Sequence, residues 1–190
     1  MKVFFVTTNQ FKIDELEAYL AARRLGDRLM VSMFRYPLQE ILHSDIERIV
    51  RQKTIEAYEQ IRCPCIVEHS GLFMDALPGL PGGVGRIVWD AIGERMCGFL
   101  SPTDPRNAVA RSLLGYCDGR RVRIYTGETR GHVADRARGS YAFSWDPVFI
   151  PEGSQETYGE MGPQRKQLTS PGAKAWAEFI DKEVLRPPHR

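Results

Sequence analysis

Apolar runs and amphipathic stretches alternate along the chain, and this pattern predicts strands that alternate with helices. Residues 2–7 (KVFFVT) form a continuous apolar run between polar residues, as expected of a buried central strand. The next segment predicts a helix with Asn9 as its N-cap, because apolar residues recur there at helical spacing, at Ile13, Leu16 and Leu20. The chain therefore opens with a strand, a short turn and an amphipathic helix.

The next third of the chain continues the alternation. A second strand is predicted at 29–34, and a capping box at 44–47 predicts the start of the helix that follows it. The apolar stripe of this helix runs from Ile46 to Ile61. Residues 65–67 then form a short apolar strand.

The second half of the chain predicts a β-hairpin and a final helix. Residues 107–116 and 121–125 alternate apolar and polar positions on either side of a Cys-Asp-Gly turn signal. The remaining expected pieces are a further bend and strand in 126–134, an irregular piece at 157–161, and a last helix from 173 to about 184. We predict a single domain over residues 1–190 of the α/β class, with an elongated, mixed central sheet flanked by helices.

Composition narrows the class of protein. The chain has 190 residues, of which 43% are hydrophobic and 26% are charged, as in ordinary soluble globular proteins. Its net charge of +2 does not indicate nucleic acid, and no apolar run approaches the length of a membrane span. The four cysteines lack the spacing of a zinc site. We expect a reduced, cytoplasmic protein with neither a membrane nor a nucleic acid as partner.

Two lysines lie where the local pattern does not favour them. Lys12 falls in the first turn of the first helix, where a cation opposes the helix dipole, and Lys53 falls within the apolar stripe of the second helix. Each could be a surface lysine whose ammonium reaches water. A bound anion would also explain both, because a helix N-terminus that follows a strand and a turn is a ready phosphate site.

The stretch from Cys65 to Arg86 is the main candidate for a functional site. It places Glu68, His69 and Ser70 at the predicted end of a buried strand, where open α/β sheets bind ligands. A loop rich in glycine and proline follows, which lets backbone approach a ligand closely, and Arg86 at its far end can meet an anion. The plainer interpretation is a strand, a turn and a solvated arginine.

Six sequence blocks keep their order and spacing across nearly the whole chain. Residues 7–12 (TTNQFK) resemble a T-G-N-x-x-K phosphate turn, and residues 68–82 (EHSGLFMDALPGLPG) resemble E-D-S/T-G-L…D-A-L-x-G-x-P-G. Residues 125–133 resemble F-x-G-x-x-x-G-x-I, and residues 138–149 resemble R-G and F-G-W/Y-D-P-x-F, with Ser144 in place of the glycine. Residues 157–166 resemble T-Y/F-A-E-M…K-N. Together the blocks resemble the inosine triphosphate pyrophosphatase family, which removes non-standard purine nucleoside triphosphates such as ITP, dITP and XTP.

The resemblance implies that a metal-activated water splits the α–β phosphate linkage and releases a nucleoside monophosphate and pyrophosphate. It also implies a nucleotide cleft between two lobes, Mg²⁺ as cofactor and assembly as a homodimer. Carried over by position, the implied residues are Glu68 and His69 for catalysis; Glu40 and Glu68 for the metal; Lys12, Lys53, Arg86 and Lys166 for phosphates; Phe143, Trp145 and Asp146 for the base; and Thr8, Asn9, Ser70 and Ser170 for further substrate contacts.

The chain departs from the family pattern at two places that bear on function. His69 stands where the family has the aspartate linked to metal and water activation, and an imidazole is a poor ligand for Mg²⁺. Pro171-Gly172 stands where the family has a His-Arg pair that donates hydrogen bonds to the 6-oxo group of the base. Lys174 or Arg165 could replace those donors.

Three hypotheses follow from these matches and departures. The first is an active pyrophosphohydrolase with a rebuilt metal site. The second is a catalytically weak or silent relative that binds a purine nucleoside triphosphate as a sensor and signals to a protein partner, for example in antiviral defence. The third is a scaffold with a vestigial pocket, which we discount because the phosphate-side cations, Glu40 and the aromatic cluster are retained together.

Overall fold

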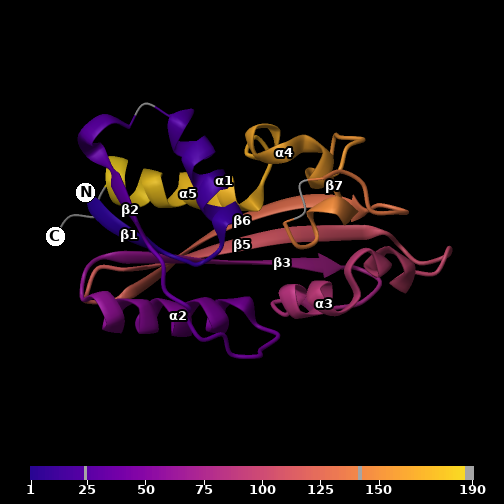
Figure 1. Cartoon of the computed structure of the whole chain (residues 1–190), viewed down its shortest axis with the longest axis horizontal. Helices are drawn as coiled ribbons and strands as arrows, with labels where there is room; N and C mark the ends of the chain where they lie inside the picture. Colours follow the sequence, from indigo (N-terminus) through magenta and orange to yellow (C-terminus); the bar gives the residue numbers. More distant parts are fainter. Residues whose placement is uncertain (24, 141–142, 187–190) are drawn as a thin grey trace.

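A computed structural model describes residues 1–23, 25–140 and 143–186. Its centre is one seven-stranded sheet in the order β2-β1-β3-β5-β6-β7, with β4 paired to β3 (Figure 1). The strands are β1 (Lys2–Val6), β2 (Met30–Phe34), β3 (Cys65–Met74), β4 (Pro81–Gly82), β5 (Asn107–Cys117), β6 (Val122–Val133) and β7 (Phe149–Pro151). β1 pairs in parallel with β2 and β3, and the other pairings are antiparallel, so the prediction of a mixed sheet is confirmed.

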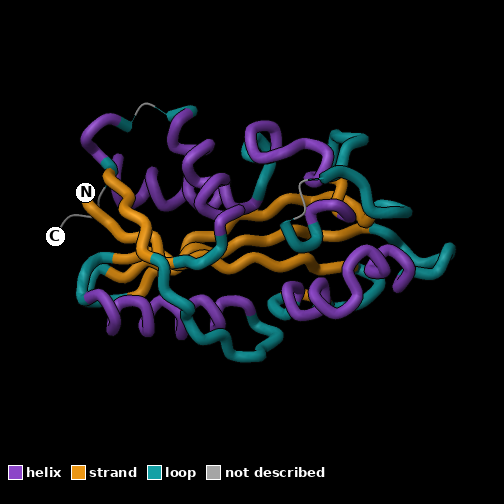
Figure 2. Tube along the Cα trace, viewed as in Figure 1, coloured by secondary structure: helices purple, strands orange, loops and turns teal. Residues whose placement is uncertain are grey.

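Helices cover both faces of the sheet, as Figure 2 shows. The α-helices are α1 (Gln10–Ala21), α2 (Ile46–Ile61), α3 (Gly85–Ile92), α4 (Tyr158–Lys166) and α5 (Pro171–Phe179). Short 3-10 segments lie at Gly26–Arg28, Gly93–Phe99 and Asp146–Val148, and a π-helical turn at Ile180–Leu185 continues α5. α1, α4 and α5 lie on one side of the sheet, and α2 and α3 lie on the other (Figure 1). No helix in the described part of the chain combines the length and apolar character needed to cross a membrane.

The two faces of the sheet bury separate hydrophobic clusters. On the α1 and α5 side, Leu16 and Trp176 pack with residues of β1, including Phe5. On the α2 side, Val50 packs against Val67 of β3. Because burial of apolar area is the main stabilising term in folding, these clusters hold α1, α2 and the central strands in fixed positions around the site described below.

The central stretch folds differently from the prediction. The strand expected at residues 65–67 is in fact the ten-residue β3, so Glu68, His69 and Ser70 lie in its middle and not at its end. β3 pairs with β5 through ten consecutive residue pairs, from Cys65–Cys117 to Met74–Ala108. This long antiparallel pairing stabilises an extended backbone through polar residues that interrupt the apolar run.

Three other local predictions needed correction. α2 is capped by Asp45, whose side chain accepts a hydrogen bond from the Glu47 backbone N–H, and not by a capping box at Ser44. The strand expected to bend near residue 126 is one continuous twelve-residue strand, β6. The piece at 157–161 is not irregular: Thr157 and Glu160 form a capping box that begins α4.

Other predictions were confirmed. Asn9 caps α1, as expected. The hairpin is formed by β5 and β6, and Glu40 lies in the loop between β2 and α2. The described residues share one continuous sheet, and a division into two lobes stays a prediction.

Candidate functional site: a pocket where β1 ends beside β3

The site lies at a gap in the pairing of the sheet. β1 pairs with β3 only at Phe4–Cys65 and Phe5–Ile66 and ends at Val6, and β4 pairs with β3 again only from Leu72. Between these two pairings, no strand in the described part of the chain pairs with residues 67–71 of β3 along the edge that faces β1 and β4. The carboxyl end of a parallel strand therefore meets an open edge of β3, which is the position where α/β sheets bind ligands.

A pocket of about 260 Å³ occupies this gap. Its walls come from the end of β1, the start of α1, the loop before α2, α2 itself, the middle of β3, the start of α3 and the segment before β7. The predicted site residues that line it are Thr8, Asn9, Lys12, Glu40, Lys53, Glu68, His69, Ser70, Arg86, Phe143 and Trp145. The structure thus brings together residues from six parts of the sequence that are far apart along the chain.

Lys12 is turned into the site and not into solvent. The Asn9 side chain accepts a hydrogen bond from the Phe11 backbone N–H, and this cap fixes the first turn of α1. The Lys12 Nζ donates to the backbone oxygen of Glu68 at 2.8 Å and lies 4.0 Å from the Glu68 Oε1. Burial lowers the pKa of Lys12, against the attraction of Glu68. A buried ammonium with so little solvation is well placed to bind an anion.

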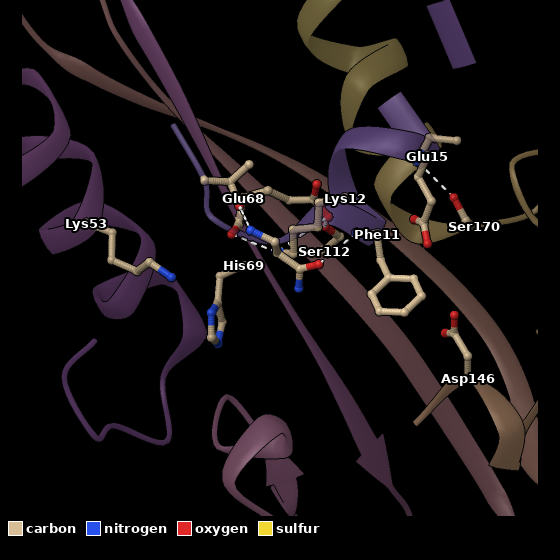
Figure 3. A network of polar contacts seen from close by, with 12 residues as sticks. Phe11, Lys12, Glu15, Lys53, Glu68, His69, Ser112, Asp146 and Ser170 are labelled. Carbon is tan, nitrogen blue, oxygen red and sulfur yellow. Dashed lines mark hydrogen bonds and ion pairs between the residues drawn. The ribbon is translucent and has the colours of Figure 1, made fainter. Parts of the chain in front are cut away.

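Glu68 and His69 are neighbours in sequence but point to opposite faces of the sheet, because side chains alternate along a strand. The Glu68 Oε1 accepts a hydrogen bond from the Ser112 Oγ of β5 at 2.7 Å, on the face covered by α1 and α5 (Figure 3). A Cβ placed on Gly172 of α5 would lie 3.3 Å from the same oxygen. Glu68 is therefore held against the N-terminus of α5, where the helix dipole favours a carboxylate.

His69 lies on the α2 face, between two hydrogen-bond acceptors. Its Nε2 lies 2.9 Å from the Gly83 backbone oxygen, and its Nδ1 lies 3.3 Å from the Glu40 Oε2. A carbonyl oxygen can only accept, so Nε2 carries a hydrogen and donates it. Neither ring nitrogen faces open space in this arrangement, and His69 links the glycine-rich loop to Glu40.

Glu40 is kept ionised by two basic neighbours. The Lys53 Nζ donates to the Glu40 Oε2 at 2.8 Å. Burial alone would raise the pKa of Glu40, but the hydrogen bond and charge of His69 and the charge of Lys53 lower it to about 2. Lys53, which the sequence pattern placed in an apolar stripe, thus points into this polar cluster (Figure 3).

The oxygen ligands in the pocket fit Mg²⁺. Glu40 and Glu68 lie on different elements that line the same pocket, and among the described residues no group donates a hydrogen bond to the Glu40 Oε1 or the Glu68 Oε2. The described side chains form no cluster of three or more His, Cys, Asp or Glu that could enclose a metal ion. This donor set suits Mg²⁺, which is commonly bound by one or two carboxylates together with waters and substrate phosphates.

Arg86 and Lys166 differ in how they meet the pocket. Arg86 lines it from the start of α3, where its Nε contacts both carboxylate oxygens of Asp90 one turn later. Lys166 is 2% exposed and does not line the pocket between the described residues. The structure therefore places three of the four predicted phosphate-side cations together and the fourth elsewhere.

Lys166 joins an aromatic cluster next to the pocket. Its Nζ donates to the Asp146 Oδ2 at 2.6 Å and to the Glu15 Oε1 at 2.7 Å, and it lies 4.9 Å from the centre of the Phe143 ring. Asp146 is fully buried, and its Oδ1 has no hydrogen-bond partner among the described residues. On this placement Lys166 belongs with Phe143 and not with the phosphate-side lysines.

Trp145 serves the core as well as the pocket. It is 4% exposed and packs edge-on against Phe149, with ring centroids 5.8 Å apart. Its cluster includes Tyr158 of α4. Core packing therefore accounts for most of its surface, and only part of the side chain faces the pocket.

The loop before α5 offers no replacement for the missing His-Arg pair. Ser170 caps α5 by accepting from the Ala173 backbone N–H, and it borders a small cavity beside Lys12 and Glu68. The Lys174 Nζ donates to the Glu128 backbone oxygen and to the Thr129 Oγ1, at 2.7 and 2.9 Å. Arg165 pairs with Glu156. Neither of the two candidate substitutes reaches the pocket.

Sequence reasoning missed several residues of the site. Ser112 and Gly83, which hold Glu68 and His69, lie in segments interpreted only as a strand and a loop. Glu15 follows Phe11 by four residues, and that helical spacing is a sequence signal that both lie on the same side of α1. The contact between Phe11 and Phe143 joins segments too far apart in the chain for any sequence pattern to reveal it.

Comparison with known proteins gives a consistent family. A sequence model of the Ham1 family matches residues 3–182. The chain is 38% identical over 183 residues to a dITP/XTP pyrophosphatase of Methanopyrus kandleri, with 95% of each chain covered. It is 34% identical over 178 residues to a dITP/XTP pyrophosphatase of Hyperthermus butylicus, with 93% of this chain and 92% of that chain covered. The solved structure of a HAM1 protein from Coxiella burnetii has the same fold, with a TM-score of 0.75 at 21% identity over 94% of this chain and 97% of that chain.

Proposed function

Because the chain belongs to the Ham1 family, we propose that it is a nucleoside triphosphate pyrophosphohydrolase for purine nucleotides such as ITP, dITP and XTP. The observation that carries the proposal is the composition of the pocket between β1 and β3. It gathers three cations, Lys12, Lys53 and Arg86, with two carboxylates and an aromatic ring, Phe143. Cations suit a triphosphate, carboxylates suit its metal ion, and an aromatic face suits a base.

The triphosphate would lie along the three cations, with the base toward Phe143. Glu68 is the better candidate for the general base, because its Oε2 accepts no hydrogen bond from the described residues, whereas both ring nitrogens of His69 face acceptors. Glu68 would take a proton from a water whose oxygen bonds to the α-phosphorus. The bond from that phosphorus to the bridging oxygen breaks, and the electron pair leaves with pyrophosphate.

Glu40 would hold Mg²⁺ together with substrate phosphates and waters, and Glu68, whose Oε2 serves as the base, would lie beside the ion. The ion would neutralise phosphate charge and lower the pKa of a bound water. Lys53 and His69 would keep the Glu40 carboxylate ionised and oriented toward the pocket. Lys12 would place the phosphates next to the edge of β3 where Glu68 lies.

The decisive experiment is product analysis with dITP and Mg²⁺ in water enriched in ¹⁸O. We expect dIMP and pyrophosphate, with the heavy oxygen in dIMP, because attack occurs at the α-phosphorus. Orthophosphate as product, or label in pyrophosphate, would contradict the proposed bond cleavage. Mass spectrometry of the separated nucleotides distinguishes these outcomes.

The alternative is a nucleotide sensor that binds without turnover. The relatives described above are named as pyrophosphatases, which favours the hydrolase. Calorimetric titration with dITP and Mg²⁺, followed by recovery of the nucleotide, separates the two hypotheses. Tight binding with the triphosphate recovered intact would identify a sensor and direct the search to a protein partner.

Base selectivity is expected to be weak. Pro171 and Gly172 have no side-chain donor, and Lys174 donates elsewhere, so little in the loop before α5 distinguishes a 6-oxo from a 6-amino group. A net hydrogen bond between the protein and the 6-position of the base contributes only about 0.5–1.5 kcal/mol, and about 1.4 kcal/mol corresponds to about tenfold. Without the His-Arg donors, we expect the kcat/KM values for ITP and ATP to lie within about tenfold of each other. Steady-state kinetics with both nucleotides test this, and a preference for ITP above 100-fold would contradict it.

Two further parts of the proposal concern the setting of the reaction. The four cysteines are free thiols, which suits a reducing compartment such as the cytoplasm. Assembly as a homodimer is proposed from the resemblance to the family alone.

A further inference from the structure

Phe11, which is 37% exposed, stacks on Phe143, a half-buried residue that lines the pocket. The two rings stack with centroids 5.6 Å apart and an angle of 21° between their planes. Phe11 is the second residue of α1, and Phe143 lies just before the turn that leads into β7. Segments 132 positions apart in the sequence thus meet through these two rings.

Core packing does not account for this contact. Phe11 is 37% exposed, and neither ring belongs to the hydrophobic clusters formed by the described residues. A large apolar side chain at the start of a helix gains little from burial when more than a third of it faces water. An aromatic pair that is partly open to solvent beside a polar pocket is better explained by a flat ligand.

The position of Phe11 within α1 ties this pair to the phosphate end of the pocket. Lys12 follows it directly and reaches Glu68, and in the view of Figure 3 the Phe11 ring lies between Lys12 and Asp146. Successive residues of a helix point about 100° apart, so one turn can present a cation in one direction and a ring in another. The first turn of α1 can therefore contact both ends of a nucleotide.

Phe143 is the better anchored of the two rings. The Lys166 Nζ lies 4.9 Å from its centre and is itself fixed by two carboxylates, Asp146 and Glu15. Glu15 comes from the same face of α1 as Phe11, one turn further along, so the helix meets this region at two points.

We propose that Phe11 is the second aromatic wall of the base site, and that the purine inserts between Phe11 and Phe143. This inference rests on the proposed function. Two stacking contacts at about 3.5 Å each need ring planes about 7 Å apart, so the present pair must separate. Phe11, as the exposed ring, moves outward while Phe143 stays in place. Stacking on both faces of the base makes no hydrogen bonds with the atoms at its edge. This agrees with the absence of side-chain hydrogen-bond donors at Pro171 and Gly172.

The test is calorimetric titration of the whole chain and of Phe11→Ala with two probes, ITP and inorganic tripolyphosphate, each with Mg²⁺. Loss of one stacking wall is expected to weaken ITP binding by about 5- to 150-fold. Tripolyphosphate has no base, so its affinity should change by less than about twofold. Phe11→Trp, which keeps an aromatic face, should bind ITP within about threefold of the unchanged chain.

Ile55→Ala is the matched control, because Ile55 is a half-exposed apolar residue on the outer side of α2. It should leave the affinity for both probes unchanged. Unchanged ITP binding by Phe11→Ala would overturn the second wall, and so would an equal loss for ITP and tripolyphosphate, which would indicate a distorted phosphate turn. If the unchanged chain binds tripolyphosphate but neither binds nor cleaves ITP, the proposed function fails, and this inference fails with it.

Discussion

Replacing Lys166 with methionine is expected to lower the free energy of unfolding by about 3–5 kcal/mol near pH 8. Lys166 is 2% exposed, and its ammonium lies 2.6 Å from Asp146 and 2.7 Å from Glu15. Methionine has a similar length but no charge, so near pH 8 the fully buried Asp146 must either stay charged without its counter-ion or take up a proton. Both outcomes cost folding free energy, because breaking a buried ion pair by removing one partner is strongly destabilising.

The loss should depend on pH, and its sign follows from the two ionisable groups. Burial raises the pKa of Asp146 from 3.8 to about 7, against the attraction of Lys166. Burial would lower the pKa of Lys166, but Asp146 and Glu15 together raise it above its ordinary value, so the ammonium stays charged. Without that ammonium the pKa of Asp146 rises further. A carboxyl with a raised pKa in the folded state binds its proton more tightly there, so stability falls as pH rises through that pKa.

The deficit of Lys166→Met should therefore be largest above pH 7 and smaller near pH 5, where the carboxyl is protonated. Urea denaturation at pH 8 and pH 5 measures both values. Lys174→Met is the control, because it makes the same chemical change at an exposed lysine that donates to Glu128 and Thr129. We expect it to cost less than about 1 kcal/mol. A deficit for Lys166→Met that is equally small, or that is the same at both pH values, would contradict the interpretation.

The sequence predicted those parts of the fold that depend on local pattern. The apolar run of β1, the Asn9 cap of α1 and the β5–β6 hairpin are each encoded within a few neighbouring residues. The length of β3 is not, because Glu68, His69 and Ser70 read as the end of a strand until β5 is known to pair with them. α4 was missed for a related reason: its backbone is interrupted at Gly162, beside Pro163, so its sequence lacks a continuous helical pattern.

The same distinction applies to the site. The sequence pattern singles out Lys12 and Lys53, because a cation is unfavourable in the first turn of a helix and in an apolar stripe. Both residues line the pocket. Lys166 shows no such conflict in sequence, because its partners, Asp146 and Glu15, are 20 and 151 residues away. A residue whose role depends only on distant partners leaves no local signal, and the Phe11–Phe143 pair is a second example.

Replacing His69 with aspartate is expected to raise turnover of ITP by about 10²–10⁴-fold in the presence of Mg²⁺. His69 is 6% exposed, lies 3.3 Å from the Glu40 Oε2 and donates to the Gly83 backbone oxygen. Aspartate at this position would add a second carboxylate beside Glu40, and hard oxygen ligands are those that Mg²⁺ prefers. Steady-state hydrolysis at saturating ITP measures the gain.

The same substitution should make stability depend on the metal. Without Mg²⁺ the new carboxylate would lie beside the Glu40 carboxylate and the Gly83 carbonyl, and the hydrogen bond from His69 would be lost, so a lower Tm than that of the unchanged chain is expected. Binding of Mg²⁺ to the folded state alone then raises Tm with concentration. The increase should be larger for His69→Asp than for the unchanged chain, and a thermal melt over a Mg²⁺ series compares them.

His69→Asn separates charge from shape, because asparagine matches aspartate in size but brings no carboxylate. If charge is what the position lacks, the aspartate variant gains turnover and metal-dependent stability and the asparagine variant gains neither. If both variants turn over ITP at the rate of the unchanged chain, position 69 does not limit the reaction. Glu68 and Glu40 would then be sufficient for the observed hydrolysis. Lower turnover in both than in the unchanged chain would show that the imidazole itself contributes, by holding Glu40 and the Gly83 loop in the arrangement seen here.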